Sequence, residues 1–158
     1  MHHSWKVYLL ELWYYIDPIG RLRRSGAKIG KNVFIGRSTY VELENASLLT
    51  IEDNVTIAAH TKIILHDSSL ENVAGFPVYV APVILRKNCY VGANTTILPG
   101  SDIGTYTIVG ANSLVTGKLK PNSVYIGQPA RYYCSVKQLQ KKWQSNGKIE
   151  ANYNLHAF

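Results

Sequence analysis

The chain has 158 residues, of which 46% are hydrophobic, and a formal net charge of +7. This length suffices for one domain with its own core, and no apolar run approaches the ~20 residues that span a bilayer. Cys89 and Cys134 form no CxxC pair, so neither a zinc knuckle nor a disulfide framework is indicated. The scattered basic residues accompany no zinc-finger, RRM or helix-turn-helix pattern, so we expect no nucleic-acid partner.

Residues 1–28 are predicted to form an N-terminal helical cap. Residues 5–16 are typical of a short helix that ends near Pro18 and Gly20, because proline and glycine interrupt helices. The aromatic side chains of this segment could cap the following domain, contact a neighbouring subunit or, with the arginines of residues 21–24, touch a membrane interface as a peripheral contact through residues 5–24. Capping or subunit packing is favoured. No signal peptide is evident, so we expect a cytoplasmic protein.

A period of six residues dominates the middle of the chain. Aliphatic residues recur at this spacing, with two interruptions, at Ile29, Ile35, Val41, Ile51, Ile57, Ile63, Leu85, Val91, Ile97, Ile103, Val109 and Val115. Neither the helix period of 3.6 nor the strand period of 2 accounts for this spacing. Three residues after many of these aliphatics stands an asparagine, a residue that tolerates left-handed backbone angles. The chain is therefore predicted to bend at these positions.

Three hexads make one triangular coil, so the twelve hexads predict four stacked coils over residues 29–120. Two insertions interrupt the repeat, one of four residues around residues 44–47 and a longer one over residues 67–84. Residues 121–158 are predicted to form a C-terminal extension with a helix over residues 135–145. Insertions on a rigid scaffold are frequent positions of functional sites.

The repeat resembles that of the left-handed parallel β-helix, an all-β fold built from hexapeptides; the left hand comes from the resemblance. Residues 51–69, IEDNVTIAAHTKIILHDSS, are similar to the segment of bacterial sugar and polysaccharide O-acetyltransferases in which the catalytic histidine opens a loop. Residues 81–131 resemble the CoA-binding coils of this family and end in its N-S-V-x-x-G-x-P-A pattern. The resemblance implies acetyl-CoA as cosubstrate, a sugar-like acceptor, a role in polysaccharide biosynthesis and a homotrimer with sites between subunits.

Transfer of an acetyl group to a sugar hydroxyl needs a base, and histidine is suited to this role by its pKa. His60 and His66 both lie three residues after an aliphatic, at predicted corners. The resemblance maps the catalytic histidine to His66, which opens the long insertion, in preference to His60. Either Asp67, which is adjacent, or Glu42, which is expected one coil away, could orient it. By the resemblance, the position of Glu42 corresponds to an asparagine near the acceptor in galactoside and maltose acetyltransferases.

The remaining candidates come from the resemblance and from their places in the repeats. The expected acceptor-binding residues are Glu42, His60, Asp67, Asn72 and Tyr79. The expected cofactor-binding residues are Tyr90, Gly92, Ala93, Gly110, Ala111, Thr116, Lys118, Lys120 and Arg131. Small residues would allow close approach of the pantetheine arm, and the basic ones suit the CoA phosphates. The family often has Thr-Lys where this chain has Thr116 and Gly117.

The implied mechanism is direct transfer, in which His66 removes the acceptor proton and the oxygen attacks the thioester carbonyl. No metal is expected. Two other functions stay open, an N-acetyltransferase acting on an amino-sugar nucleotide and a non-catalytic β-helix scaffold. A γ-type carbonic anhydrase has a similar trimer but needs three histidines on zinc, and only two lie in the repeats.

Overall fold

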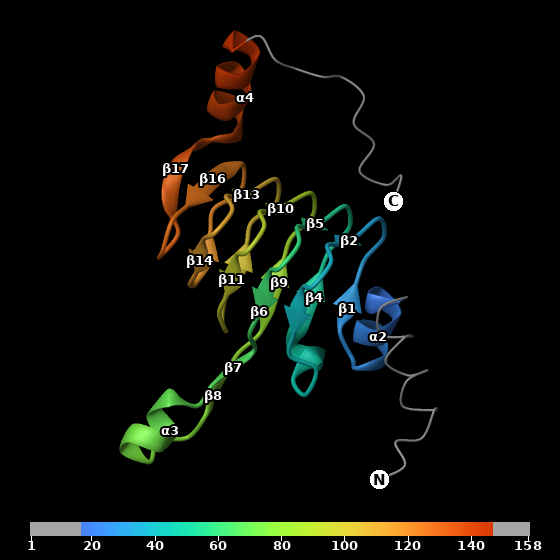
Figure 1. The fold of residues 1–158 in the computed structure, drawn as a ribbon, viewed down its shortest axis with the longest axis vertical. Helices are drawn as coiled ribbons and strands as arrows, with labels where there is room; N and C mark the ends of the chain where they lie inside the picture. Colours follow the sequence, from blue (N-terminus) through green and yellow to red (C-terminus); the bar gives the residue numbers. More distant parts are fainter. Residues whose placement is uncertain (1–16, 147–158) are drawn as a thin grey trace.

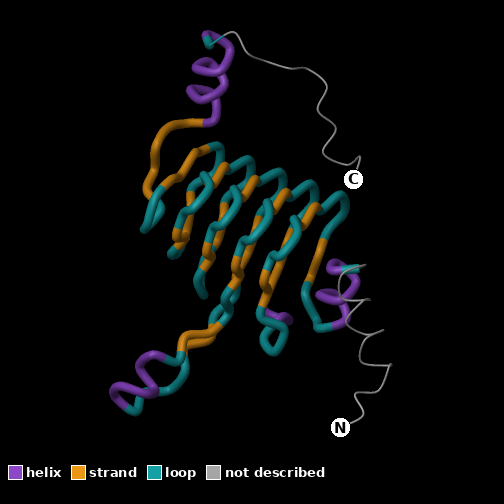
Figure 2. The backbone as a smooth tube through the Cα atoms, viewed as in Figure 1, coloured by secondary structure: helices purple, strands orange, loops and turns teal. Residues whose placement is uncertain are grey.

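The computed structural model of the protein describes residues 17–146, so the helix predicted over residues 5–16 lies outside the described residues. Within them the chain consists mostly of short strands in three parallel sheets (Figure 1). Successive strands pass through the three sheets in turn, and each pairs with the strand one coil away. Figure 2 shows the strands stacked as regular rungs joined by short loops. This is the arrangement of a parallel β-helix.

The strands have the following bounds. The first sheet contains β1 (Lys28–Ile29), β4 (Leu49–Ile51), β9 (Val83–Leu85), β12 (Asp102–Ile103) and β15 (Lys118–Leu119). The second sheet contains β2 (Phe34–Ile35), β5 (Thr56–Ile57), β10 (Tyr90–Val91), β13 (Ile108–Val109), β16 (Ser123–Ile126) and the antiparallel β17 (Arg131–Ser135). The third sheet contains β3 (Tyr40–Val41), β6 (Lys62–Ile63), β11 (Thr96–Ile97) and β14 (Leu114–Val115). The turns between the sheets are called corners. The first corner leads from the first sheet to the second, the second corner from the second sheet to the third, and the third corner from the third sheet back to the first.

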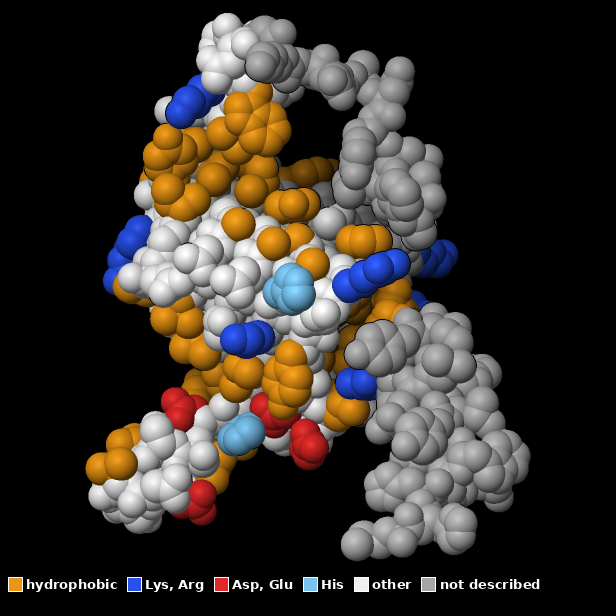
Figure 3. Space-filling view, in the orientation of Figure 1, with side chains coloured by type: hydrophobic (Ala, Val, Ile, Leu, Met, Phe, Trp, Pro, Cys, Tyr) orange, Lys and Arg blue, Asp and Glu red, His pale blue; other side chains and the backbone are white. Residues whose placement is uncertain are grey.

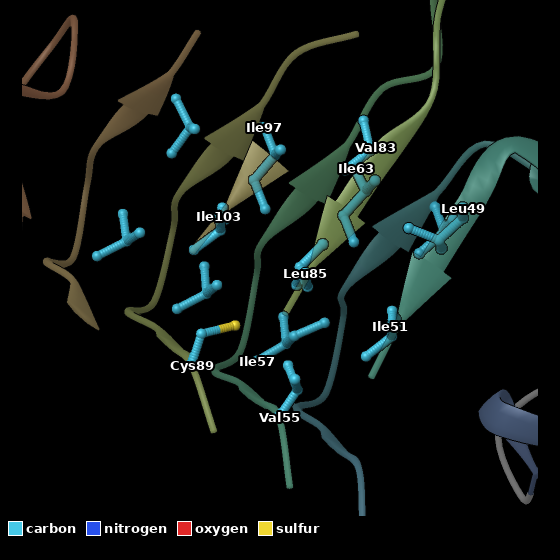
Figure 4. Packing of buried hydrophobic residues seen from close by; sticks show 14 of the residues in the cluster. Leu49, Ile51, Val55, Ile57, Ile63, Val83, Leu85, Cys89, Ile97 and Ile103 are labelled. Atoms are coloured by element: carbon cyan, nitrogen blue, oxygen red, sulfur yellow. The ribbon is translucent and has the colours of Figure 1, made fainter. Parts of the chain in front are cut away.

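The core is a column of aliphatic side chains inside the coils. Each aliphatic of the predicted period is the last residue of a strand, and Figure 4 shows side chains such as those of Ile57, Ile63 and Ile97 inside the coils. Since successive residues of a strand point to opposite faces, the residue before each aliphatic points outward. Only Ile29 and Ile35, in the first coil, are incompletely buried. Full burial of one such side chain contributes about 1.5–3 kcal/mol. The strands therefore lie where the six-residue period predicts.

The corners adopt left-handed backbone angles, as the asparagine positions predict. Asn32, Asn54, Asn88, Asn94 and Asn112 have φ between 52° and 58°. The amide of Asn32 donates to Oδ1 of Asn54 at 3.1 Å, and the amide of Asn54 donates to Oδ1 of Asn88 at 3.0 Å. The asparagines thus make the bend and also join neighbouring coils.

The coil continues beyond residue 120, where the sequence predicted its end. Gly117, at φ +80°, shortens the third corner, so Leu119 ends a strand four residues after Val115 instead of six. The next core position is taken by the buried ring of Tyr125, on β16. A search for aliphatic residues at intervals of six therefore misses both Leu119 and Tyr125. After β17 comes α4 (Val136–Ser145), which lies within the predicted helical range and begins with a capping box at Ser135.

At the N-terminal end, α2 (Pro18–Arg24) begins where the sequence predicted a helix to end. Proline is tolerated in the first turn, where its missing N–H has no helical partner. Asp17 Oδ1 accepts a hydrogen bond from the Gly20 N–H at 2.7 Å and so caps the helix. Arg23 donates to the carbonyl oxygens of Ile29 and Gly30, at 2.9 Å each, and fastens α2 to the first coil.

Candidate active site

Both insertions leave the coil at the third corner, from two neighbouring coils. The first follows β3 and contains the 3-10 turn η1 (Ala46–Leu48). The second follows β6 and is a hairpin of β7 (His66–Asp67) and β8 (Tyr79–Val80) with α3 (Ser69–Ala74) between them. We call residues 66–80 the arm; it projects away from the coils (Figure 1). Because β3 and β6 pair in register, the two insertions start side by side.

His66 and Glu42 meet where the arm leaves the coil. Nδ1 of His66 lies 2.7 Å from Oε2 of Glu42. Glu42 is 3% exposed, whereas the His66 side chain is 43% exposed. Nδ1 itself is buried, so the exposed part of the imidazole is its other edge. The pair does not have the geometry of a hydrogen bond, so it is a close electrostatic contact.

The Glu42 carboxylate is held by several donors. Its Oε2 also accepts a hydrogen bond from the Leu65 N–H at 3.0 Å, and its Oε1 accepts one from the Asn45 side-chain amide. Burial opposes ionisation of Glu42, but the contacts with Asn45, Leu65 and His66 outweigh it and lower its pKa. An ionised carboxylate therefore faces Nδ1 at neutral pH. An acceptor contact of Glu42 stays a prediction.

Glu42 is expected to make the stability of the protein depend on pH. Its folded-state pKa lies below the usual 4.5, so its stabilising contribution is present above about pH 4.5 and is lost as the pH falls through the folded pKa. In Glu42→Gln this contribution disappears. We expect urea unfolding, followed by circular dichroism, to show a weaker dependence of the unfolding free energy on pH below about pH 5 in the variant than in the wild type. Parallel curves for the two proteins would contradict this account of Glu42.

Asp67 and Tyr79 lie on the face of the arm opposite His66. In the β7–β8 hairpin His66 pairs with Val80 and Asp67 pairs with Tyr79, and successive residues of a strand point to opposite faces. Asp67 Oδ1 accepts a hydrogen bond from the Ser69 N–H at 2.9 Å, which lowers the pKa of Asp67. Of the two carboxylates that the sequence left open as the orienting group, Glu42 is the one beside the imidazole. Asn72 is exposed on α3.

The two histidines of the repeats lie at opposite ends of β6. His60 is exposed and stands at the second corner with φ 60°, as its position in the hexad predicts. His66 was predicted at a corner too, but it starts β7, because the chain leaves the coil there instead of turning. Within one chain His60 is thus separated from His66 by the third sheet.

Two of the predicted cofactor-binding residues are needed for coil stacking. A Cβ atom added at Gly92 would lie 2.4 Å from the backbone nitrogen of Ala111. One added at Gly110 would lie 2.8 Å from Cγ2 of Ile126. Both distances are shorter than real Cβ contacts, so these glycines allow neighbouring coils to approach each other.

The other predicted cofactor-binding residues are spread around the coil. Tyr90, on β10, points outward from the second sheet, and Ala93 and Ala111 follow this sheet at the second corner. Thr116 and Lys118 stand instead at the third corner, on either side of the shortened turn. Lys120 follows β15 at the first corner, and Arg131 begins β17. A single chain does not bring these side chains into one site.

The arm carries an unusual number of exposed apolar side chains. Their exposed fractions range from 36% to 84%, and they are Leu70, Val73, Phe76, Val78, Tyr79 and Val80. No residue of α3 is buried. Figure 3 shows apolar side chains on the projecting arm, next to acidic ones.

Several other groups bear on the chemistry. Cys89 is buried inside the coil, and this burial raises the pKa of its thiol to about 12. It is therefore a poor nucleophile, as its interior position predicts. Among residues 17–146, no three or more His, Cys, Asp or Glu side chains form a group that could hold a metal ion. The helices in the same range are too short or too polar to cross a membrane.

Residues 82–117 match the family model of the bacterial transferase hexapeptide (six repeats). The chain is 29% identical over 124 residues to the galactoside O-acetyltransferase of Escherichia coli (strain K12), covering 72% of this chain and 59% of that protein. It is 28% identical over 149 residues to the putative colanic acid biosynthesis acetyltransferase WcaF of the same organism, covering 81% and 73% of the two chains.

Among solved structures, a maltose O-acetyltransferase from Clostridium difficile 630 superimposes with a TM-score of 0.58, at 24% identity and covering 72% of each chain. This likeness shows a shared fold, and the family model matches where the coils are most regular. The repeats, the parallel sheets and the relatives agree. Residues 82–117 thus match the bacterial transferase hexapeptide, and the chain is similar to acetyltransferases over most of its length.

Proposed function

We propose that the protein is an acetyl-CoA-dependent O-acetyltransferase that acetylates a sugar hydroxyl of a cell-envelope glycan or its precursor. The observation that carries this proposal is the His66 imidazole, held by a buried carboxylate on one edge and exposed on the other at the base of the arm. The relatives named as galactoside and colanic acid acetyltransferases favour a sugar acceptor. The left-handed winding of the coils and a cytoplasmic location belong to the same proposal.

In this mechanism His66 is the general base. Ionised Glu42 favours the proton on Nδ1, which leaves the lone pair on Nε2, the nitrogen on the ring edge away from the carboxylate. Nε2 removes the proton of the acceptor hydroxyl as its oxygen bonds to the thioester carbonyl carbon. The C–S bond then breaks, and His66 returns the proton to the departing thiolate sulfur. Backbone N–H groups would stabilise the oxyanion formed in between.

We further propose a homotrimer with sites between subunits. The expected acetyl-CoA contacts at the second and third corners of one chain are separated by a whole sheet, so residues from two chains are needed to line one cleft. The exposed apolar side chains of the arm favour burial against a neighbouring subunit, since apolar patches of this kind mark contact surfaces.

The proposal is tested by incubating the full chain with acetyl-CoA and a panel of sugars and nucleotide sugars. We expect CoA release that depends on the acceptor, and a product whose acetyl group is removed by hydroxylamine, as an ester is. A hydroxylamine-stable amide product would instead identify an N-acetyltransferase. Failure to bind acetyl-CoA would favour a non-catalytic scaffold.

A further inference from the structure

We propose that Asn45 is a positioning residue for His66: its amide holds one oxygen of Glu42 and thereby directs the other oxygen at Nδ1 of the imidazole. The consequence for catalysis rests on the proposed function. The positioning itself can be measured without turnover.

The donors around Glu42 are divided between its two oxygens. Oε1 accepts from the Asn45 amide, while Oε2 accepts from the Leu65 N–H at 3.0 Å and lies 2.7 Å from Nδ1 of His66. These donors come from three segments: the first insertion, the end of the third sheet and the arm. Among residues 17–146, Asn45 is the donor that holds Oε1. Without it a buried acceptor would be left unsatisfied, which favours rotation of the carboxylate.

The first insertion is built so that Asn45 keeps its place. The Leu48 N–H donates to the Asn45 carbonyl oxygen at 2.9 Å, and the Ala46 N–H donates to the Leu43 carbonyl oxygen at 3.1 Å. Ala46, next to Asn45, is completely buried. The turn is therefore anchored in the core directly beside the donor. The extra residues, which the coil itself does not require, thus deliver a hydrogen-bond donor to the base of the arm.

A fixed carboxylate selects one form of the neutral imidazole. When Oε2 faces Nδ1, the proton is favoured on Nδ1, and Nε2 is left as the acceptor of a proton. If Glu42 turns away, this preference weakens and part of the His66 population carries its proton on Nε2. That part cannot remove a proton from an acceptor at Nε2.

The test compares Asn45→Ala with the wild-type full chain by nitrogen NMR of ¹⁵N-histidine-labelled protein, the His66 signal being assigned with His66→Ala. We expect the Nδ1–H form to dominate in the wild type and a mixture of both forms in the variant. We also expect kcat to fall roughly 10- to 100-fold, as for other residues that orient a functional histidine, with KM for acetyl-CoA unchanged. Asn45→Asp, which keeps the shape but replaces the donor by an acceptor, should shift the mixture in the same direction. Ser47→Ala, in the same turn and exposed, is the matched control and should behave as the wild type.

The outcomes separate this inference from the proposed function. A wild-type distribution of the two imidazole forms in folded Asn45→Ala or Asn45→Asp would overturn the role of Asn45. A shifted distribution in a protein that transfers no acetyl group would support the positioning and contradict the acetyltransferase. A rise in KM together with a fall in kcat and an unchanged imidazole signal would also count against positioning, because it indicates that Asn45 contacts a substrate directly.

Discussion

His66→Ala is expected to lower acetyl transfer by roughly 10²- to 10⁴-fold, which is the usual contribution of a positioned general base. Acetyl-CoA should still bind, because the residues expected to contact it lie elsewhere on the coils. The alanine removes Nε2 and leaves Glu42 without its neighbour, but the coil on either side of the site is unchanged. Steady-state turnover and calorimetric titration with CoA measure the two effects separately.

The matched control is His60→Asn. His60 is the other histidine of the repeats, and its φ of 60° is one that asparagine adopts at the corresponding corners. This variant therefore removes an imidazole without straining the backbone. Because His60 is an expected acceptor-binding residue and not the base, we expect its loss to raise the KM for the acceptor while kcat stays close to that of the wild type. Full activity of His66→Ala, or an equal loss in His60→Asn, would refute the assignment of His66 as the base.

Gly92→Ala is expected to destabilise the protein by about 2–3 kcal/mol, because Gly92 is buried against the next coil. The new methyl group would lie 2.4 Å from the backbone nitrogen of Ala111 and 2.8 Å from its Cα. These are backbone atoms of the next coil, so the clash is relieved only by separating two rungs. Thermal and urea unfolding should both show the loss.

Gly75→Ala separates this clash from the general cost of replacing glycine. Gly75 follows α3 with φ +63°, and an added Cβ would meet no atom within 4 Å. We expect it to cost about 1 kcal/mol, the penalty for an alanine in the left-handed region. If Gly92 instead serves only the approach of pantetheine, Gly92→Ala would retain its stability and lose affinity for CoA.

The fold could be predicted to a large extent because its signal is local and repeated. Each coil repeats the same interior positions, so the prediction that a residue such as Ile97 or Ile103 is buried is supported by the same spacing in every other coil. The last coil escaped prediction because Gly117 shortens one corner and the ring of Tyr125 replaces an aliphatic. Both are local departures that a fixed period cannot accommodate.

The site was predictable only in part, because it depends on contacts across coils. Counting hexads placed Glu42 one rung from His66, and the structure brings them to 2.7 Å. The role of Asn45 was missed, since it arises from the geometry of a four-residue insertion whose presence was the one available signal. Asp67 was a weaker candidate for the reason that the sequence already offered: adjacent residues of a strand face opposite ways.

Both insertions start at the third corner, and this has a consequence for how such a protein can diversify. Ile63 pairs with Val41 on one side and with Ile97 on the other, and after the arm Leu85 pairs with Ile51. The chain thus leaves the stack and rejoins it without altering any rung. Residues 67–79 could be exchanged for a hairpin of different length and chemistry while His66 and its carboxylate keep their places. New acceptor preferences would then arise by replacement of this one segment at the third corner, and the remaining coils would fold as before.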